Sequence, residues 1–368
     1  MMRSMRRNNV CATLPSLVFG LWLGVAPGSA VAEQAAEWPK VPGAVFALRN
    51  GNATTPVVAF DTKGRDLMAF NLATRGRALL GRFSELVCHG GSFHAVDAGT
   101  WAGLQLAKSG GFTLEVTLTP AEAQPKAPGV VVAFGDDQGE DFALLQDKVG
   151  LSLRLGKAKP IALFAPAAGK PVHVLIACDK QKWAACRDGK SVGSGPLPAG
   201  LPAWGNRQIV MGAAWSGAEP WRGRMEAVAL FPRALTAEEA AGQAAAIHAL
   251  QAVRKPAGTV RFKGTLVRQA KTSGLDEIRP YTRSLTVAEY KVGKVLAGEW
   301  KQPTLTVLHW MIMDGKRLPI ADRKAGTAVE LSVEPLAEHP QLESCRRDEL
   351  ADADLDAELF YCESETGP

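Results

Sequence analysis

The sequence lacks three features that would each point to a class of protein. No long apolar run follows the N-terminal segment, which excludes a helical membrane span in the body of the chain. No C-x-x-C pair is present, which excludes the common zinc patterns, and no Lys/Arg run in the body exceeds two residues, which argues against nucleic acid as a partner. Apolar residues make up 46% and charged residues 21% of the 368 residues, so a packed core can form and wholesale disorder is excluded.

Recognisable catalytic motifs are also absent. There is no G-x-S-x-G elbow, no H-E-x-x-H pair and no glycine-rich phosphate loop. The six histidines are dispersed, except where the segment Cys88–His94, CHGGSFH, brings a thiol close to two imidazoles. This segment is either a metal or reactive-cysteine site, or a strand–turn–strand in which the glycine pair makes the turn, and we favour the turn.

The N-terminus has the pattern of a signal peptide over residues 1–32. Three arginines within the first seven residues precede an apolar stretch from Val10 to about Ala26, and Ala30 and Ala32 occupy the small-residue positions of a cleavage site. Prolines within and just after the apolar stretch argue against the alternative, an uncleaved anchor helix. We expect cleavage after Ala32 and a periplasmic or secreted protein without a lipid anchor.

Charge is distributed unevenly along the chain. The whole sequence carries 42 basic and 37 acidic residues, for a net charge of +5. Residues 338–368 hold ten acids and two arginines, whereas residues 33–337 hold 37 basic and 27 acidic residues and carry +10. Such a body could attract polyanions. Because no dense basic run exists, we instead expect scattered, solvated lysines and a weak dependence of any binding on salt.

Five cysteines follow the predicted cleavage site, and oxidising conditions outside the cytoplasm favour disulfides. The predicted pairs are Cys178 with Cys186, and Cys345 with Cys362. A hairpin centred on residue 182 would place the first two cysteines directly opposite each other. The second pair would bracket the acidic tail. Cys88 is then left as a buried thiol.

Between about residues 41 and 231, short apolar segments alternate with turn signals at regular spacing. This pattern predicts antiparallel sheets packed as a sandwich. The expected strands are Gly43–Leu48, Pro56–Phe60, Ala78–Cys88, Ser92–Val96, Phe112–Leu118, Val130–Phe134, Phe142–Gln146, Leu151–Leu155, Val172–Cys178, Trp183–Arg187, Gln208–Gly212 and Arg222–Phe231. A capping box at Thr236–Glu239 starts one helix, which runs to about Val253 and is followed by a linker at 254–259.

Two segments carry a family resemblance. Phe112–Leu118, FTLEVTL, is similar to the F-T-[LI]-E-[AV] strand of laminin-G-like domains in the concanavalin A-like jelly-roll superfamily. Trp221–Thr236, WRGRMEAVALFPRALT, resembles the closing strand and helix start of the same domains. The resemblance covers about residues 41–250. It implies an all-β fold, an antiparallel jelly-roll sandwich with a closing helix, as a domain over 33–253.

The superfamily includes glycosidases, which carry their catalytic carboxylates on an E-x-D-x-x-E strand. That string is absent here, and Glu115 and Glu226 stand alone on their expected strands. We therefore expect a domain that does not hydrolyse glycans.

Two kinds of ligand are considered for this domain. Many laminin-G-like domains bind calcium through carboxylates at the sandwich rim, and the densest acidic turn here contains Asp136, Asp137, Glu140 and Asp141. The alternative is a solvated acidic hairpin. Sugars stack on indole rings, and the candidate tryptophans in or beside loops are Trp101, Trp204 and Trp215. The alternative is that these tryptophans cap the core.

A second β module is predicted over residues 260–336, as a small barrel or sandwich. The expected strands are Val260–Val267, Ser284–Leu296, Leu305–Met313 and Val329–Val333. The segment Glu289–Gly298 is similar to a strand of netrin-like and related OB-type barrels, a likeness from which we infer no function. His309 alternates with apolar residues and is expected in a core. The acidic tail, 337–368, is predicted to contain a short helix over Arg346–Tyr361.

These observations predict an exported, two-domain protein of a bacterial envelope that acts by binding. The expected partner is a glycan or an envelope protein, held by the laminin-G-like domain. No cofactor is required, and calcium is the one candidate considered above. Two other functions stay open, namely a glycosidase or lyase with a non-standard site, and a structural component of the envelope. A carboxylate pair in a groove would favour the enzyme, whereas an exposed Trp215 on a flat rim would favour binding.

Overall fold

The computed structural model describes residues 43–49, 57–60, 66–70, 72–198, 200–352 and 357–363. The predicted signal peptide and its cleavage site lie outside these residues. Within them, no helix is long and apolar enough to cross a membrane.

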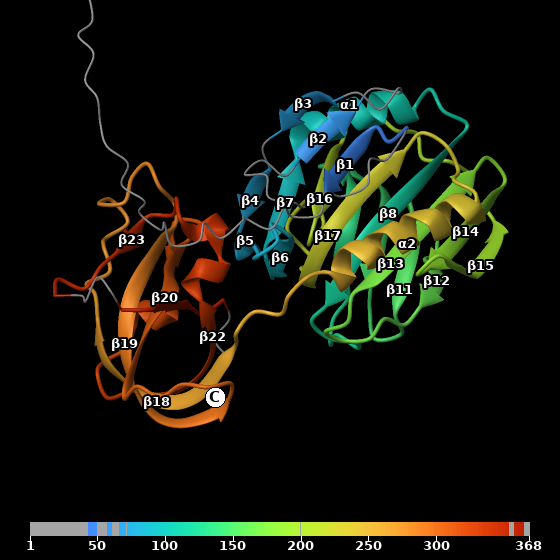
Figure 1. The fold of residues 1–368 in the computed structure, drawn as a ribbon. Coiled ribbons are helices and arrows are strands. Elements are labelled where there is room, and N and C mark those ends of the chain that lie inside the picture. The colour runs from blue at the N-terminus through green and yellow to red at the C-terminus, as the bar shows by residue number, and fades with distance from the viewer. Residues whose placement is uncertain are drawn as a thin grey trace, which may run out of the picture. The chain divides into compact units, whose positions relative to one another are not determined.

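Two antiparallel sheets form a β-sandwich from the described residues between 43 and 252, here called the sandwich (Figure 1). The first sheet has the order β15-β14-β13-β8-β17-β1-β2-β3, with β6 also beside β17 and β5 beside β6. Its strands are β1 (Phe46–Arg49), β2 (Val57–Phe60), β3 (Asp66–Phe70), β5 (Ala78–Leu80), β6 (Leu86–His89), β8 (Gly111–Pro120), β13 (Val172–Asp179), β14 (Lys182–Arg187), β15 (Lys190–Pro196) and β17 (Arg222–Phe231). The second sheet has the order β12-β11-β10-β9-β16-β7-β4. Its strands are β4 (Ala73–Arg75), β7 (Ser92–Ala95), β9 (Gly129–Asp136), β10 (Gly139–Gln146), β11 (Leu151–Leu155), β12 (Ile161–Phe164) and β16 (Gln208–Met211). The predicted all-β sandwich is confirmed.

Alternating side chains define the two faces of each sheet. In β8, Phe112, Leu114 and Val116 lie in the core between the sheets, whereas Glu115 is buried on the opposite face. The segment expected as a single strand over Ala78–Cys88 is instead the hairpin of β5 and β6. The chain reverses between them, where Ser84 has a φ of 58°.

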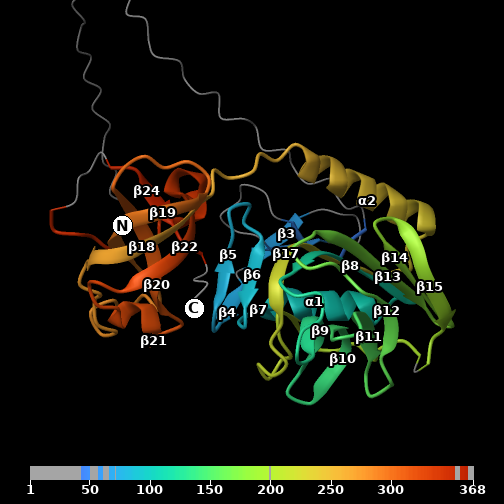
Figure 2. The same ribbon diagram turned by 90° about the horizontal axis from the view of Figure 1, so that it is seen from below.

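The sandwich carries two α-helices among its described residues. α2 (Ala237–Ala252) starts at the predicted capping box, with reciprocal bonds between Thr236 and Glu239, and lies across the outer face of the first sheet (Figure 1). α1 (Val96–Leu106), on the other side of that sheet in Figure 2, was not predicted. It contains two glycines, Gly99 and Gly103. In the fold they let α1 approach the backbone of residues 205–209, where a Cβ atom would lie within 3 Å of backbone atoms.

The described residues between 260 and 363 form a small barrel, as predicted for the second module. Five strands close it in the order β20-β24-β22-β18-β19 and back to β20. The strands of this sheet are β18 (Val260–Gln269), β19 (Ser284–Ala297), β20 (Thr304–Met313), β21 (Lys316–Arg317), β22 (Ala328–Pro335), β23 (Arg347–Asp348) and β24 (Leu359–Tyr361). Short 3₁₀ turns lie at Pro319–Asp322, Leu336–Glu338 and Pro340–Leu342. His309 is buried as expected, 3.0 Å from the hydroxyl of Tyr290.

The predicted helix over Arg346–Tyr361 is wrong. The described part of this segment contributes β23, parallel to β19, and β24, which lies between β20 and β22. Phe360 enters the barrel core, and Tyr361 packs in a second apolar cluster. The described end of the tail is therefore a part of the barrel and not an appendage, because its four apolar residues, Leu359–Cys362, alternate between two buried surfaces.

Neither predicted disulfide forms, because all five described cysteines are thiols. The hairpin of β13 and β14 exists, but Cys178 pairs with Trp183 and Cys186 with Leu175, three residues away from the predicted register. An odd shift turns the two thiols to opposite faces, Cys178 into the core and Cys186 toward α2. Cys345 and Cys362 belong to different apolar clusters. Cys88 is a buried thiol, as expected.

Candidate functional site

The outer face of the second sheet gathers polar side chains from three strands. In β7 and β16, Phe93, Ile209 and Met211 point into the sandwich core. The alternate positions, Ser92, His94 and Gln208, therefore share the outer face. β4 pairs with β7 so that its Arg75 lies directly opposite Ser92 on this face.

Trp215 lies in the loop that connects β16 to β17. It is partly buried, and the guanidinium of Arg75 stands 6.0 Å from its ring centroid and donates a hydrogen bond of 3.4 Å to its carbonyl oxygen. The loop also contacts the sheet, because Ala214 packs in a cluster with Ala133 and Ala143. Arg75, Ser92, His94, Gln208 and Trp215 are here called the Trp215 site.

His94 is held neutral at this site. Burial, reinforced by the positive charge of Arg75, lowers the pKa of His94 to about 4, and the Gln208 side chain opposes this only weakly. Its Nε2 lies 3.0 Å from the hydroxyl of Ser92. Its Nδ1 and the indole Nε1 of Trp215 are both buried and have no hydrogen-bond partner among the described residues. The Trp215 site therefore contains two buried polar atoms that no described residue satisfies.

The other two predicted sugar-binding tryptophans are placed differently. Trp204 is only 8% exposed, with edge contacts to Phe112, Phe134 and Phe142 at centroid distances of 5.0, 5.2 and 5.8 Å. It caps the core and has no face to offer a ligand, so its assignment to a binding site was wrong. Trp101 is partly buried on α1.

The predicted calcium ligands form the tip of the β9–β10 hairpin, where Asp137 is exposed in a two-residue turn. Asp136 and Asp141 both bind the guanidinium of Arg207, and Glu140 binds Arg154. Burial raises the pKa of Asp141 above its ordinary value, although Arg207 acts in the opposite sense. Within the described ranges, no group of three or more His, Cys, Asp or Glu residues is arranged to hold a metal ion. These carboxylates are satisfied by arginines, which gives the calcium prediction no geometric support.

Glu115 and Glu226, the two isolated strand carboxylates, lie on the side of the first sheet that α2 covers. Glu115 and His173 are both fully buried and lie 3.2 Å apart on the outer side of the first sheet. Glu226 accepts hydrogen bonds from Gln251 and Arg254 at the end of α2. A retaining glycosidase needs two carboxylates about 5 Å apart at one accessible site. Glu115 instead has a buried partner in His173, and Glu226 has partly buried partners in Gln251 and Arg254.

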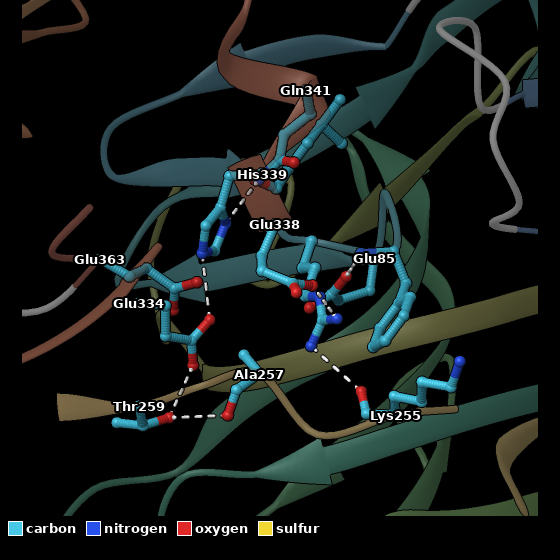
Figure 3. A network of polar contacts seen from close by, with 12 residues as sticks. Glu85, Lys255, Ala257, Thr259, Glu334, Glu338, His339, Gln341 and Glu363 are labelled. Carbon is cyan, nitrogen blue, oxygen red and sulfur yellow. Dashed lines mark hydrogen bonds and ion pairs between the residues drawn. The ribbon is translucent and has the colours of Figure 1, made fainter. Parts of the chain in front are cut away.

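A polar network missed by the sequence analysis surrounds a cavity of about 740 Å³, lined by residues of the sandwich, the linker and the barrel. Figure 3 shows His339 between Glu334, 3.0 Å away, and Gln341, with Thr259 reaching Glu334 from the other side. Arg82 binds Glu338 and donates to the carbonyl oxygen of Lys255. The network joins three separate stretches of sequence, around Arg82, Thr259 and His339, and no spacing rule could have grouped them.

The charges around this cavity largely neutralise one another. Arg224 binds both Glu85 and Glu363 at 2.5 Å. Burial alone would raise the pKa of Glu363, but His89 and Arg224 hold it below its usual value. Burial raises the pKa of Tyr361, whose hydroxyl accepts a hydrogen bond from Trp310. Because its cations already have carboxylate partners, the network joins segments of the fold and offers little net charge to a ligand.

Comparison with known families adds to this geometry. The residues from Ser92 to Ala241 match the family described as the concanavalin A-like lectin/glucanases superfamily. Residues 92–241 form a concanavalin A-like domain. The match confirms the resemblance found in the sequence, and the domain includes every member of the Trp215 site except Arg75. No curated protein matches the chain in sequence.

Three examples illustrate the solved structures to which the chain is similar. A sialidase from Trypanosoma rangeli is 17% identical, with a TM-score of 0.41 over 59% of this chain and 36% of the sialidase. Domain 4 of AbnA, a GH43 extracellular arabinanase from Geobacillus stearothermophilus solved with arabinotriose, is 16% identical, with a TM-score of 0.37 over 48% of this chain and 82% of that domain. A SAP-like pentraxin from Limulus polyphemus is 14% identical, with a TM-score of 0.32 over 37% of this chain and 70% of the pentraxin. The chain thus spans about a third of the sialidase.

Proposed function

We propose that the chain is an exported, non-catalytic carbohydrate-binding protein whose concanavalin A-like domain takes its ligand at the Trp215 site. One observation carries the proposal. The indole N–H of Trp215 and Nδ1 of His94 are buried polar atoms with no hydrogen-bond partner in the described part of the chain, and Arg75 both lies beside the Trp215 ring and lowers the pKa of His94. A buried polar atom without a partner costs about 1–3 kcal/mol, so a ligand that supplies both partners recovers that free energy on binding.

A sugar hydroxyl has the chemistry to satisfy either atom. It can accept from the indole N–H and donate to an unprotonated ring nitrogen, and it can also accept if the neutral His94 carries its proton on Nδ1. The partly buried ring of Trp215 supplies an apolar surface for the C–H groups of a sugar, and Arg75 supplies further donors. The family description of residues 92–241, which includes lectins, supports the same ligand class.

The surroundings of the strand carboxylates support binding without hydrolysis. Glu115 is sealed beneath α2 with His173, and Glu226 is engaged by Arg254, so neither is poised as an acid or a nucleophile in the Trp215 site. Export is part of the proposal because of the N-terminal sequence. Sequencing the N-terminus of protein recovered outside the cytoplasm tests it, and retention of residues 1–32 would refute it.

The ligand test measures binding of gluco-, arabino- and sialyl-oligosaccharides to the purified protein by calorimetry. Trp215→Ala should weaken the affinity about 10- to 100-fold, because it removes both a stacking ring and a donor. Trp215→Phe keeps a ring and loses only the N–H, so its loss should be about 3- to 10-fold, as should that of His94→Ala. His248→Ala is the matched control, since this histidine is 48% exposed and ion-paired to Asp188 elsewhere in the sandwich.

Three results would overturn the proposal. The first is no measurable affinity for any of the oligosaccharides. The second is an unchanged affinity in the Trp215→Ala variant when thermal melts show it to be folded. The third is release of sugar products, which would replace binding by catalysis.

A further inference from the structure

Two strands of the barrel present basic side chains on one outer surface. β18 and β19 pair side by side along the barrel (Figures 1 and 2). Their exposed residues Arg261, Lys263, Lys291 and Lys294 are here called the basic ribbon. Neighbouring residues such as Phe262 and Tyr290 point the other way, into the barrel core. The four cations belong to two separate stretches of sequence and meet only because the strands pair.

The cations of the ribbon are poorly compensated. Lys263 lies directly opposite Lys294, and Thr265 lies opposite Lys291. Like charges in directly opposed positions destabilise a pair of strands. On the neighbouring strand, Glu330 binds both Arg261 and Lys263, the latter at 3.6 Å, so one carboxylate serves two cations. Lys291 and Lys294 have no ion-pair partner within the part of the chain that the structure describes.

We propose that the basic ribbon binds an acidic polysaccharide and so extends the ligand of the sandwich. The inference rests on the proposed function in its choice of a glycan as the polyanion. Neighbouring strands are about 5 Å apart and alternate residues along a strand about 7 Å apart, so the charges recur on the scale of a sugar unit. A chain of uronic acid residues can therefore meet several cations at once.

Other polyanions fit the ribbon less well. Single-stranded nucleic acids gain much of their affinity from bases stacked on aromatic rings, and β18 and β19 expose no aromatic side chain among the described residues. A membrane surface needs a cluster of apolar anchors. The exposed apolar side chains here, Val267 and Leu296, lie singly at opposite ends of the ribbon.

The experiment measures binding of polygalacturonate to the purified protein, with neutral dextran of similar length for comparison. Four phosphate-like contacts predict a fall in affinity of about 10- to 100-fold between about 50 and about 200 mM salt. The double variant Lys263→Gln/Lys294→Gln should lose at least about tenfold in affinity and show a shallower salt dependence. The matched control is Lys157→Gln/Lys159→Gln, which removes two exposed lysines from a sandwich loop and should change affinity less than about twofold.

The outcomes separate this inference from the proposed function. Equal affinities of the two double variants, or no binding of polygalacturonate, would overturn the inference, as would tighter binding of poly(dT) or of phosphatidylglycerol vesicles. If Trp215→Ala abolishes binding of neutral oligosaccharides while the ribbon variant has no effect on polygalacturonate, the proposed function stands and the ribbon fails. If only the ribbon variant has an effect, the barrel binds acidic glycans and the Trp215 site fails.

Discussion

Replacement of Trp204 by alanine should lower the free energy of unfolding of the sandwich more than replacement of Trp215 by alanine does. The ring is 8% exposed and makes edge contacts with three phenylalanines that come from both sheets. Truncation of so buried a ring leaves a cavity and costs about 3–5 kcal/mol. For a domain of this size the melting temperature should fall by about 6–20 °C. Trp215→Ala, which removes a partly buried ring on the rim, should cost about 1 kcal/mol or less.

The backbone at Trp204 sharpens the test. Its φ is 45°, a left-handed conformation that is costly for a bulky residue and easy for glycine. Trp204→Gly should therefore be at least as stable as Trp204→Ala, the reverse of the usual order. Urea unfolding followed by circular dichroism gives both free energies. A loss below about 1 kcal/mol for Trp204→Ala would refute the assignment of Trp204 to the core, and a Gly variant clearly less stable than the Ala variant would refute the role of its backbone conformation.

Three further predictions concern groups that the structure buries. Burial raises the pKa of Cys178 to about 12, so iodoacetamide should not modify this thiol in the native protein at mildly alkaline pH. After unfolding without reductant, iodoacetamide should modify both Cys178 and Cys186. A peptide in which a disulfide links the two cysteines would contradict this prediction. Because the folded protein lowers the pKa of His94 from its ordinary value of 6.5 to about 4, protonation favours the unfolded state, and stability that is present above pH 6.5 should fall by roughly 3 kcal/mol as the pH approaches 4. His94→Gln should remove that part of the pH dependence, and identical profiles for the two proteins would show that His94 is not buried as a neutral group. Phe360→Ala should cost the barrel about 3–5 kcal/mol and speed amide exchange in β18 and β22 but not in β8; uniform protection throughout would show that β24 is dispensable.

The sequence predicted an element well where a single short motif determines where that element begins or turns. The capping box at Thr236 defines the start of α2, and the glycine pair after His89 makes the expected turn between β6 and β7. The four predicted strands of the barrel also appear, because each is a long apolar alternation. Register was harder to predict, since moving the turn of β13 and β14 by one residue or two changes which side chains face each other. The error at Cys178 followed from this.

The candidate sites were harder to predict, because they depend on contacts between residues that lie far apart in the sequence. Trp204 and Trp215 both follow loop-like sequence, but only the positions of Phe112, Phe134 and Phe142 decide that the first is buried. Arg207 lies 66 and 71 residues from the two aspartates that it binds. The basic ribbon was missed for the same reason. Its density comes from pairing two strands, and a search for basic runs along the chain cannot detect it.

The position of β24 also determines when the barrel can close during synthesis of the chain. It lies between β20 and β22 and is the last strand of the barrel to be made. When the ribosome has delivered β18 to β22, the sandwich already has all of its strands, whereas the barrel still has a gap with an unpaired edge on either side. Unpaired edges recruit other strands, so this interval is when the nascent chain is most exposed to aggregation. The barrel must therefore wait for residues 359–361 before it can close, and the two halves of the chain mature at different times.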